Sequence, residues 1–178
     1  MGPDERAMIA GHPLATVLEN DTPENRQSPE VQSAAATLVI RTKFIDERLV
    51  RMVREGATQI VIMGAGWDTR AYRFAGLLSG VRVFEVDQPA TQTWKRRRAE
   101  EALGPPPANL TYLPIDFRVQ TLADVLASAG YDPQQKTLFI WEGVTMYLPA
   151  AAVSDTLQWI RSEEHTSELQ SLAYLVCR

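Results

Sequence analysis

The order of apolar and polar residues predicts an alternation of strands and helices from residue 59 onward. Runs of apolar residues predict strands at 59–63, 81–86, 110–115 and 137–141, and the segments between them read as helices near 69–78, 88–103 and 119–129, with another from about 150. The run 60–63 is apolar without interruption, as in a strand covered on both faces. Such alternation is typical of an α/β domain, in which helices cover both faces of a doubly wound parallel sheet.

The chain before this alternation divides into a polar segment and one long helix. Residues 1–30 are polar and interrupted by prolines, and they carry no readable chemistry. Ser28 followed by Pro29 predicts the start of a helix, and Gly56 predicts its end. Arg41 falls within the apolar stripe of this helix. Because a buried guanidinium is costly unless an anion meets it, Arg41 is either part of a structural ion pair or a ligand for a carboxylate.

The last part of the chain does not continue the pattern. From Arg161 the sequence Arg-Ser-Glu-Glu-His-Thr-Ser-Glu-Leu-Gln-Ser matches the in-frame translation of a common sequencing-library adapter, so residues 161–178 are expected to be non-native. The domain is then 31–160, truncated after the fourth strand and its helix. We expect strand 137–141 to have an open edge, and the 178-residue product to be poorly folded and inactive.

Leaving out this tail changes what composition implies. The tail contains the only cysteine, Cys177, and two of the 18 basic and three of the 22 acidic residues, so the remaining chain has a net charge of −3. This weakly acidic chain has no electrostatic footprint for nucleic acid or an anionic membrane. It has no thiolate metal site, no apolar run of membrane-spanning length and no signal peptide. We expect a cytoplasmic protein; its oligomeric state stays open.

Candidate chemistry lies at the ends of the predicted strands. The first strand runs into a turn that contains Gly64 and Gly66, which let the backbone approach a nucleotide-type ligand. Asp87, Asp116 and Glu142 follow the next three strands. Because the carboxyl ends of parallel strands meet at one edge, all these residues are expected to serve one crevice.

The glycine turn departs from the dinucleotide-binding pattern Gly-x-Gly-x-x-Gly. Thr69 occupies the position of the third glycine, and Asp68 precedes it. An acid there repels a diphosphate, so the turn suits a ligand with a ribose and a charged amino-acid end but no phosphate, such as S-adenosylmethionine. The rival interpretations are an NAD-dependent oxidoreductase and a non-catalytic cofactor-binding fragment.

Longer blocks of sequence support the interpretation as a methyltransferase. In order, they resemble the Rossmann-like class I S-adenosylmethionine-dependent methyltransferases related to leucine carboxyl methyltransferase. The blocks are 41–46 (Arg-Thr-Lys-Phe-Ile-Asp), 61–73 (Val-Ile-Met-Gly-Ala-Gly-Trp-Asp-Thr-Arg-Ala-Tyr-Arg), 84–89 (Phe-Glu-Val-Asp-Gln-Pro), 113–117 (Leu-Pro-Ile-Asp-Phe) and 139–148 (Phe-Ile-Trp-Glu-Gly-Val-Thr-Met-Tyr-Leu). The resemblance covers about residues 41–160, and the missing continuation includes the family's last strands and part of its substrate pocket.

The resemblance implies contacts to the amino-acid end of the cofactor. Gly64, Ala65 and Gly66 pass under its methionine part, and Arg41 pairs with its carboxylate. Glu142 lies near its amino group or at the substrate entrance.

The resemblance also implies contacts to the nucleoside end. Asp87 binds the ribose hydroxyls, and Asp116 and Phe117 flank the adenine. Other roles remain open for these residues: Asp87 could cap the following helix, Asp116 could cap its own loop, and Glu85, on the same strand face as Asp87, competes for the ribose.

The expected reaction is in-line methyl transfer to an oxygen of a small-molecule or peptide acceptor. Most of the acceleration comes from positioning the two reactants. A carboxylate acceptor needs no general base, whereas a hydroxyl acceptor does. The sequence identifies neither the acceptor nor a catalytic residue, and it predicts no metal.

Overall fold

The computed structural model describes residues 22, 27–117, 119–163 and 172–176, and the chain divides into two compact units, Met1–Asp46 and Glu47–Arg178. Most of the polar segment 1–30 lies outside the described residues. Helix α4 (Pro29–Arg54) begins where Ser28 and Pro29 predict. The backbone N–H of Val31 donates to Oγ of Ser28 at 3.3 Å, as expected of a serine cap.

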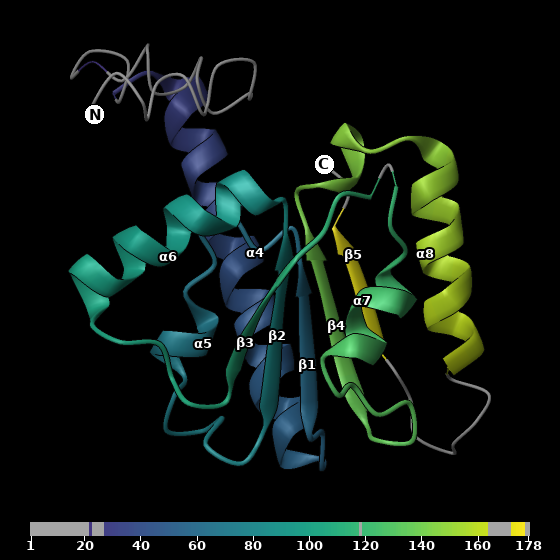
Figure 1. The fold of residues 1–178 in the computed structure, drawn as a ribbon. Coiled ribbons are helices and arrows are strands. Elements are labelled where there is room, and N and C mark those ends of the chain that lie inside the picture. Colours follow the sequence, from purple (N-terminus) through teal and green to yellow (C-terminus); the bar gives the residue numbers. More distant parts are fainter. Residues whose placement is uncertain (1–21, 23–26, 118, 164–171, 177–178) are drawn as a thin grey trace. The chain divides into compact units, whose positions relative to one another are not determined.

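The second unit contains the predicted alternation (Figure 1). Its strands are β1 (Gln59–Met63), β2 (Arg82–Asp87), β3 (Leu110–Pro114), β4 (Thr137–Glu142) and β5 (Leu172–Val176). Its helices are α5 (Arg70–Arg73), α6 (Pro89–Leu103), α7 (Leu122–Ser128) and α8 (Ala150–Glu163), with a 3₁₀ turn at Thr145–Tyr147.

The strands form one parallel sheet in the order β3-β2-β1-β4-β5. Strand order reverses between β1 and β4, because the chain builds outward from β1 to β3 and then crosses back to place β4 on the other side of β1. In doubly wound folds, ligands bind at the carboxyl ends of the strands on either side of such a reversal. The predicted α/β fold is confirmed.

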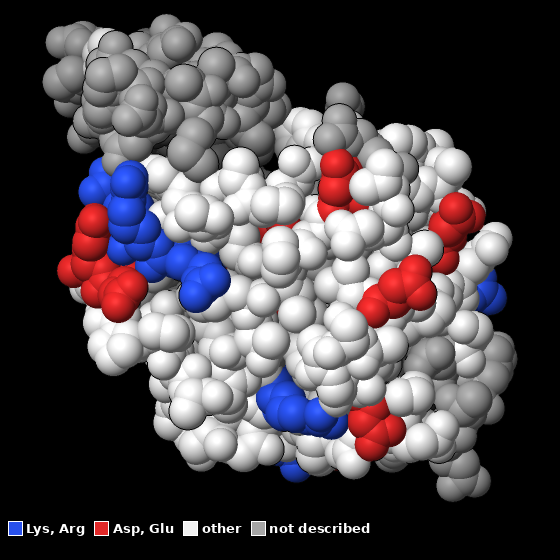
Figure 2. Space-filling view, viewed as in Figure 1, with Lys and Arg blue, Asp and Glu red and all other residues white. Residues whose placement is uncertain are grey.

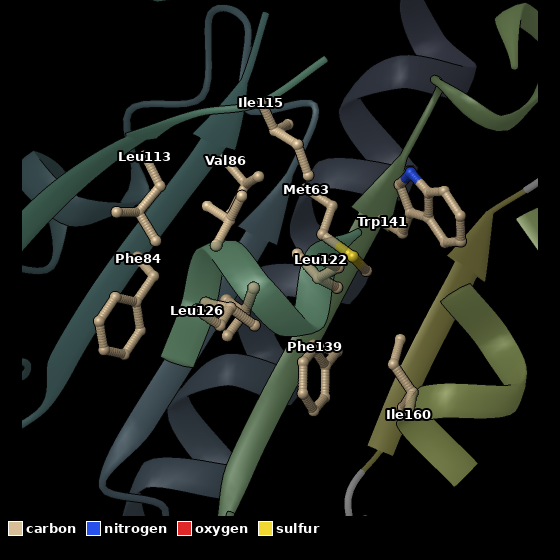
Figure 3. Packing of buried hydrophobic residues seen from close by; sticks show 12 residues of the cluster. Met63, Phe84, Val86, Leu113, Ile115, Leu122, Leu126, Phe139, Trp141 and Ile160 are labelled. Atoms are coloured by element: carbon tan, nitrogen blue, oxygen red, sulfur yellow. The ribbon is translucent and has the colours of Figure 1, made fainter. Parts of the chain in front are cut away.

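One face of the sheet packs against α7 and α8 (Figure 3). Leu122 and Leu126 of α7 and Ile160 of α8 are buried against side chains of the sheet. The sheet contributes Val61, Met63, Phe84, Val86, Leu113, Phe139 and Trp141. These positions alternate along each strand, so the intervening residues face the opposite side.

The opposite face meets α6. Glu85 lies between Phe84 and Val86 on β2, and it contacts Gln92 and Lys95 of α6. Both faces of the sheet therefore carry helices, as the alternation predicts.

Two helices are shorter than predicted. Helix α5 covers 70–73 rather than 69–78, and the chain continues through turns that contain Gly76 and Gly80. Helix α7 begins after Thr121, whose hydroxyl accepts a hydrogen bond from the N–H of Asp124 at 3.2 Å. Residues before this cap lie outside the helix because a capping threonine takes non-helical backbone angles.

The far edge of β4 differs from the sequence-based expectation of an open edge. Strand β5 pairs with β4 in parallel, from Leu138 opposite Leu172 to Glu142 opposite Val176. Its sequence Leu-Ala-Tyr-Leu-Val is apolar, and an unpaired strand edge offers a row of hydrogen-bonding groups to any such extended segment. Whether residues 161–178 are native is a separate question, and their non-native origin stays a prediction.

Candidate functional site

The parallel register places the predicted site residues of this unit at one edge of the sheet. Met63, the last residue of β1, is opposite Val86 of β2 and Trp141 of β4. The next residues along the three strands are Gly64, Asp87 and Glu142. Asp87 is in turn opposite Pro114 of β3, close before Asp116.

The turn after β1 requires glycine at its first position. Gly64 has φ +64°, and its N–H donates to the carbonyl of Val86 at 2.7 Å. A Cβ on Gly64 would lie 2.2 Å from Cγ2 of Val144, which follows β4. Ala65 also donates to Val86, at 3.2 Å. The turn is thus fixed by β2 from one side and covered by Val144 at Gly64.

Asp87 connects this turn to the start of α6. Its Oδ2 accepts from the N–H of Gly66 at 2.5 Å, and its Oδ1 accepts from the N–H of Gln88 at 2.6 Å. The residue is 9% exposed. The cap position of α6 is occupied by Gln88, so Asp87 precedes the cap, and the alternative that Asp87 itself caps the helix is wrong.

Arg70 forms a buried bridge between the ends of β1 and β4. Its side chain is 4% exposed and its Nη1 donates both to Oδ2 of Asp68 and, at 3.1 Å, to Oε2 of Glu142. The N–H of Arg70 also donates to Oδ1 of Asp68 at 2.7 Å. Asp68 is therefore paired with Arg70, two positions further along the chain.

Glu85 is a structural partner of α6. It is fully buried, and its Oε2 accepts from Nζ of Lys95 at 2.5 Å, while Nζ also lies 3.5 Å from the carbonyl of Ala65. Burial raises the pKa of Glu85 to about 7, although Lys95 opposes the shift. Glu85 is therefore held by Lys95 within the fold, and the choice between Asp87 and Glu85 for the ribose stays a prediction. Lys95 is buried in this pair. It therefore does not lie on a solvated helix face, although its exposed basic neighbours suggest such a face.

The residues after β3 form a tight turn beside an aromatic pair. The carbonyl of Asp116 accepts from the N–H groups of Val119 and Gln120, and the N–H of Asp116 donates to Oε1 of Gln120 at 3.0 Å. Phe117 stacks on Trp141, with ring centroids 6.5 Å apart and planes 23° apart. The turn is closed by backbone groups of Asp116, and a flat apolar surface lies next to it.

Arg41 belongs to the first unit, on α4, and is partly buried. Its predicted role toward a carboxylate stays a prediction.

Two further observations concern the described residues as a whole. Within the ranges that the structure describes, no three His, Cys, Asp or Glu side chains are grouped so that they could hold a metal ion. In the same part of the chain, no helix is both long enough and apolar enough to cross a membrane.

The visible surface at α6 carries charges of both signs. Figure 2 shows basic side chains with acidic ones directly beside them at this helix. Arg96, Arg97 and Arg98 are exposed there, as are Glu100 and Glu101, and Arg98 pairs with Glu101 at 3.4 Å. This mixture is consistent with the expectation of no nucleic-acid partner, which stays a prediction.

Three residues of the site were missed by reasoning from sequence: Arg70, Lys95 and Val144. Arg70 lies four positions after Gly66, and Lys95 lies three positions from Gln92 on the same helix face. The sequence contains those spacings. However, Lys95 stands in a run of four basic residues, and nothing in that run indicates that Lys95 alone is buried. Nothing in the sequence places Val144 over Gly64.

The site as a whole is acidic. Asp68, Asp87 and Glu142 contribute three carboxylates, and Arg70 contributes one guanidinium, so their formal net charge is −2. Glu85 and Lys95 form a pair of opposite charges. This environment suits a ligand with hydroxyl donors and a cationic group, and it disfavours a diphosphate.

Comparisons with known proteins agree with this chemistry. The leucine carboxyl methyltransferase family matches residues 2–161. A Frankia alni protein with the provisional description S-adenosyl-L-methionine-dependent methyltransferase is 40% identical over 124 residues, which are 70% of this chain and 43% of that protein. A Mycobacterium avium protein with the same description is 36% identical over 135 residues, covering 76% of this chain and 44% of the relative.

Among solved structures, the chain is similar to the apo form of the S-adenosylmethionine-dependent methyltransferase SibL. The TM-score is 0.45 at 12% identity, and the match covers 72% of this chain and 34% of the other. The chain spans less than half the length of the two curated relatives. Because the family match extends over most of the sequence, this chain belongs to the leucine carboxyl methyltransferase family.

Proposed function

We propose that this chain is the cofactor-binding part of an S-adenosylmethionine-dependent O-methyltransferase that acts on a carboxylate or hydroxyl of a small molecule or peptide. The observation that carries the proposal is the glycine turn surrounded by strand-end carboxylates, in a chain of the leucine carboxyl methyltransferase family. The family supports methyl transfer, and the charge of the site supports the choice of cofactor.

The ribose is assigned to Asp87. Its carboxylate oxygens accept backbone hydrogen bonds, Oδ2 from Gly66 and Oδ1 from Gln88. The two backbone contacts fix the orientation of the carboxylate before a ligand arrives. A fixed, charged acceptor is the group that best binds a pair of ribose hydroxyls.

The methionine part and the adenine of the cofactor are assigned to residues that follow the strands on either side of β2. The backbone of 64–66 lies under the methionine part. Among the described residues, a Cβ on Gly66 would meet just the carbonyl of Gly64, at 3.7 Å, so a ligand can approach there. Asp116 and Phe117 flank the adenine, with Phe117 held by its stacking on Trp141. Arg41 pairs with the carboxylate, as the family resemblance implies.

The chain contributes chiefly by binding and orientation. S-adenosylmethionine supplies an activated methyl group on a sulfonium. The carboxylates around the turn favour a positively charged ligand, while the glycine turn and Asp87 hold its reacting end in a defined position. A carboxylate acceptor then needs no base from the protein.

The proposal is tested by calorimetric titration of the folded 178-residue chain with S-adenosylhomocysteine and, separately, with NADH. We expect S-adenosylhomocysteine to bind and NADH not to bind. Binding of NADH alone would support an oxidoreductase, and binding of neither would support a non-catalytic fragment; both results contradict the proposal. A far-UV circular dichroism melt on the same sample establishes that the chain is folded.

A further inference from the structure

Three buried side-chain atoms have no hydrogen-bond partner among the residues that the structure describes: Oε1 of Glu85, Nε1 of Trp94 and Nε1 of Trp141. Glu85 contacts α6 and Trp94 is part of α6, whereas Trp141 lies on β4, one residue before the end of that strand. An indole nitrogen can only donate, so Trp141 has an N–H without an acceptor. Buried polar groups in native proteins are almost always paired, so this N–H calls for an explanation.

The burial of Trp141 makes the unpaired N–H costly. The residue is 2% exposed and belongs to the core between the sheet and α7 and α8. An N–H that moves from water into such a core loses its hydrogen bond to water, and without a replacement the folded chain is less stable. An acceptor that reaches the nitrogen removes this cost, so the position favours a ligand with an acceptor atom.

The nitrogen of Trp141 is directed toward the edge of the sheet that carries the site. Figure 3 shows it on the side of the indole that faces the carboxyl end of β4. Trp141 is opposite Met63, the last residue of β1, and Phe117, which follows β3, stacks on the indole with planes 23° apart. An acceptor that binds at this edge beside Phe117 therefore comes close to the indole nitrogen.

We propose that the indole N–H of Trp141 is the hydrogen-bond donor for a ring nitrogen of the cofactor's adenine. This inference rests on the proposed function, in which Phe117 flanks the adenine. Adenine has acceptor nitrogens, N1, N3 and N7, on several sides of its flat ring, so one of them can face a donor at its edge. Nε1 is covered in the structure, so neighbouring side chains, with the partly exposed Phe117 among them, shift as the adenine enters.

The first measurement follows the indole N–H signals of the folded 178-residue chain in a proton–nitrogen NMR spectrum. The chain has four tryptophans, and each indole signal is assigned by the variant that replaces its tryptophan with phenylalanine. On saturation with S-adenosylhomocysteine, we expect the proton of Trp141 to move to higher frequency, because an N–H that gains an acceptor is deshielded. The signal of Trp159 is the internal control and should not move, since that ring contacts Tyr131 and Phe139.

The second measurement combines a change in the protein with a change in the ligand. Trp141→Phe keeps an aromatic ring and removes the donor, whereas the 1-deaza, 3-deaza and 7-deaza forms of S-adenosylhomocysteine each lack one ring nitrogen. We expect Trp141→Phe to bind S-adenosylhomocysteine about three- to tenfold more weakly, which is the contribution of one hydrogen bond. For one of the deaza ligands, the wild type and Trp141→Phe should bind equally, because that hydrogen bond is already absent. Trp159→Phe is the matched control and should leave every affinity unchanged.

A loss of folding is separated from a loss of binding by thermal melts of every variant. If Trp141→Phe does not fold, the other three variants assign the Trp141 signal by elimination, and the spectrum of the wild type carries the test. A Trp141 signal that stays in place when S-adenosylhomocysteine binds, or a loss in Trp141→Phe that is the same for all four ligands, overturns the inference while the proposed function stands. A wild-type chain that is folded but does not bind S-adenosylhomocysteine overturns the proposed function itself.

Discussion

Asp87 combines a structural and a binding role in one carboxylate, because it accepts from Gly66 and Gln88 and is also assigned to the ribose. Replacing it with Asn keeps the shape, removes the charge and turns one of the two acceptors into a donor, so one of the two backbone N–H groups loses its partner. We expect Asp87→Asn to weaken binding of S-adenosylhomocysteine by about 1–2 kcal/mol, the difference between a charged and a neutral acceptor. Calorimetry measures the effect.

The matched control is Asp155→Asn, on the exposed side of α8, where the same chemical change should leave the affinity unaltered. Equal affinities of Asp87→Asn and the wild type would remove Asp87 from the ribose.

Gly64 is the residue at which backbone angle and packing act together. We expect Gly64→Ala to lower the free energy of unfolding by about 1–2 kcal/mol for its left-handed backbone and by a further ~1–3 kcal/mol for overpacking against Val144. Urea denaturation measures the sum. Gly80→Ala is the control, because a Cβ on Gly80 meets nothing within 4 Å.

The double variant Gly64→Ala/Val144→Ala separates the two causes. Removing the two methyl groups of Val144 should recover most of the packing part, although Cβ of residue 144 still lies 2.9 Å from the added Cβ, and it should leave the backbone part. If the two single losses simply add, Val144 does not restrict this position.

At the scale of elements, α6 is attached to β2 by the buried pair of Glu85 and Lys95. The pKa of Glu85 is raised from 4.5 to about 7 by burial, the largest cause, with smaller contributions from Asp68 and Asp87 and an opposing one from Lys95. Between these two pH values, the folded chain holds a proton on Glu85 that the unfolded chain has released. This contribution to stability is therefore complete below pH 4.5 and is lost as the pH rises through about 7.

The prediction is measured against the variant Glu85→Gln/Lys95→Met, which removes both charged groups. The free energy of unfolding of the wild type minus that of the variant should decrease as the pH rises from about 4.5 to about 7 and then level off. Denaturant titrations across this range provide the values. A difference that is constant or increases with pH would show that burial does not dominate the environment of Glu85.

At the scale of the whole molecule, the sheet depends on what lies along the edge of β4. Strand β5 pairs with all five residues from Leu138 to Glu142. Deleting residues 172–178 should therefore lower the free energy of unfolding and expose the β4 edge, which promotes association between copies. Urea denaturation and size-exclusion chromatography at several protein concentrations measure the two effects.

The same deletion also tests whether the tail from Arg161 onward takes part in the core. If residues from Arg161 onward take no part in the core, as their adapter-like sequence predicts, the deletion leaves stability and association unchanged. The structure supports the first outcome through the register of β4 and β5.

Local patterns were sufficient for the order of elements and for the glycine turn. Apolar runs, Ser28 and Gly56 predicted β1 to β4 and α4, because strand burial and helix termination depend on residues near in sequence. The strand-end acids Asp87 and Glu142 were found for the same reason: once a parallel sheet is inferred, the residues after its strands must meet at one edge.

Contacts between distant segments were decided by folding in three dimensions. Arg70 and Lys95 looked like ordinary surface charges, and only the packing of α5 and α6 on the sheet buried them against Glu142 and Glu85. Val144 reached Gly64 only because β4 crosses back beside β1. Charge pairing and steric contact depend on distance in space, and residue order carries little information about distances between segments many residues apart.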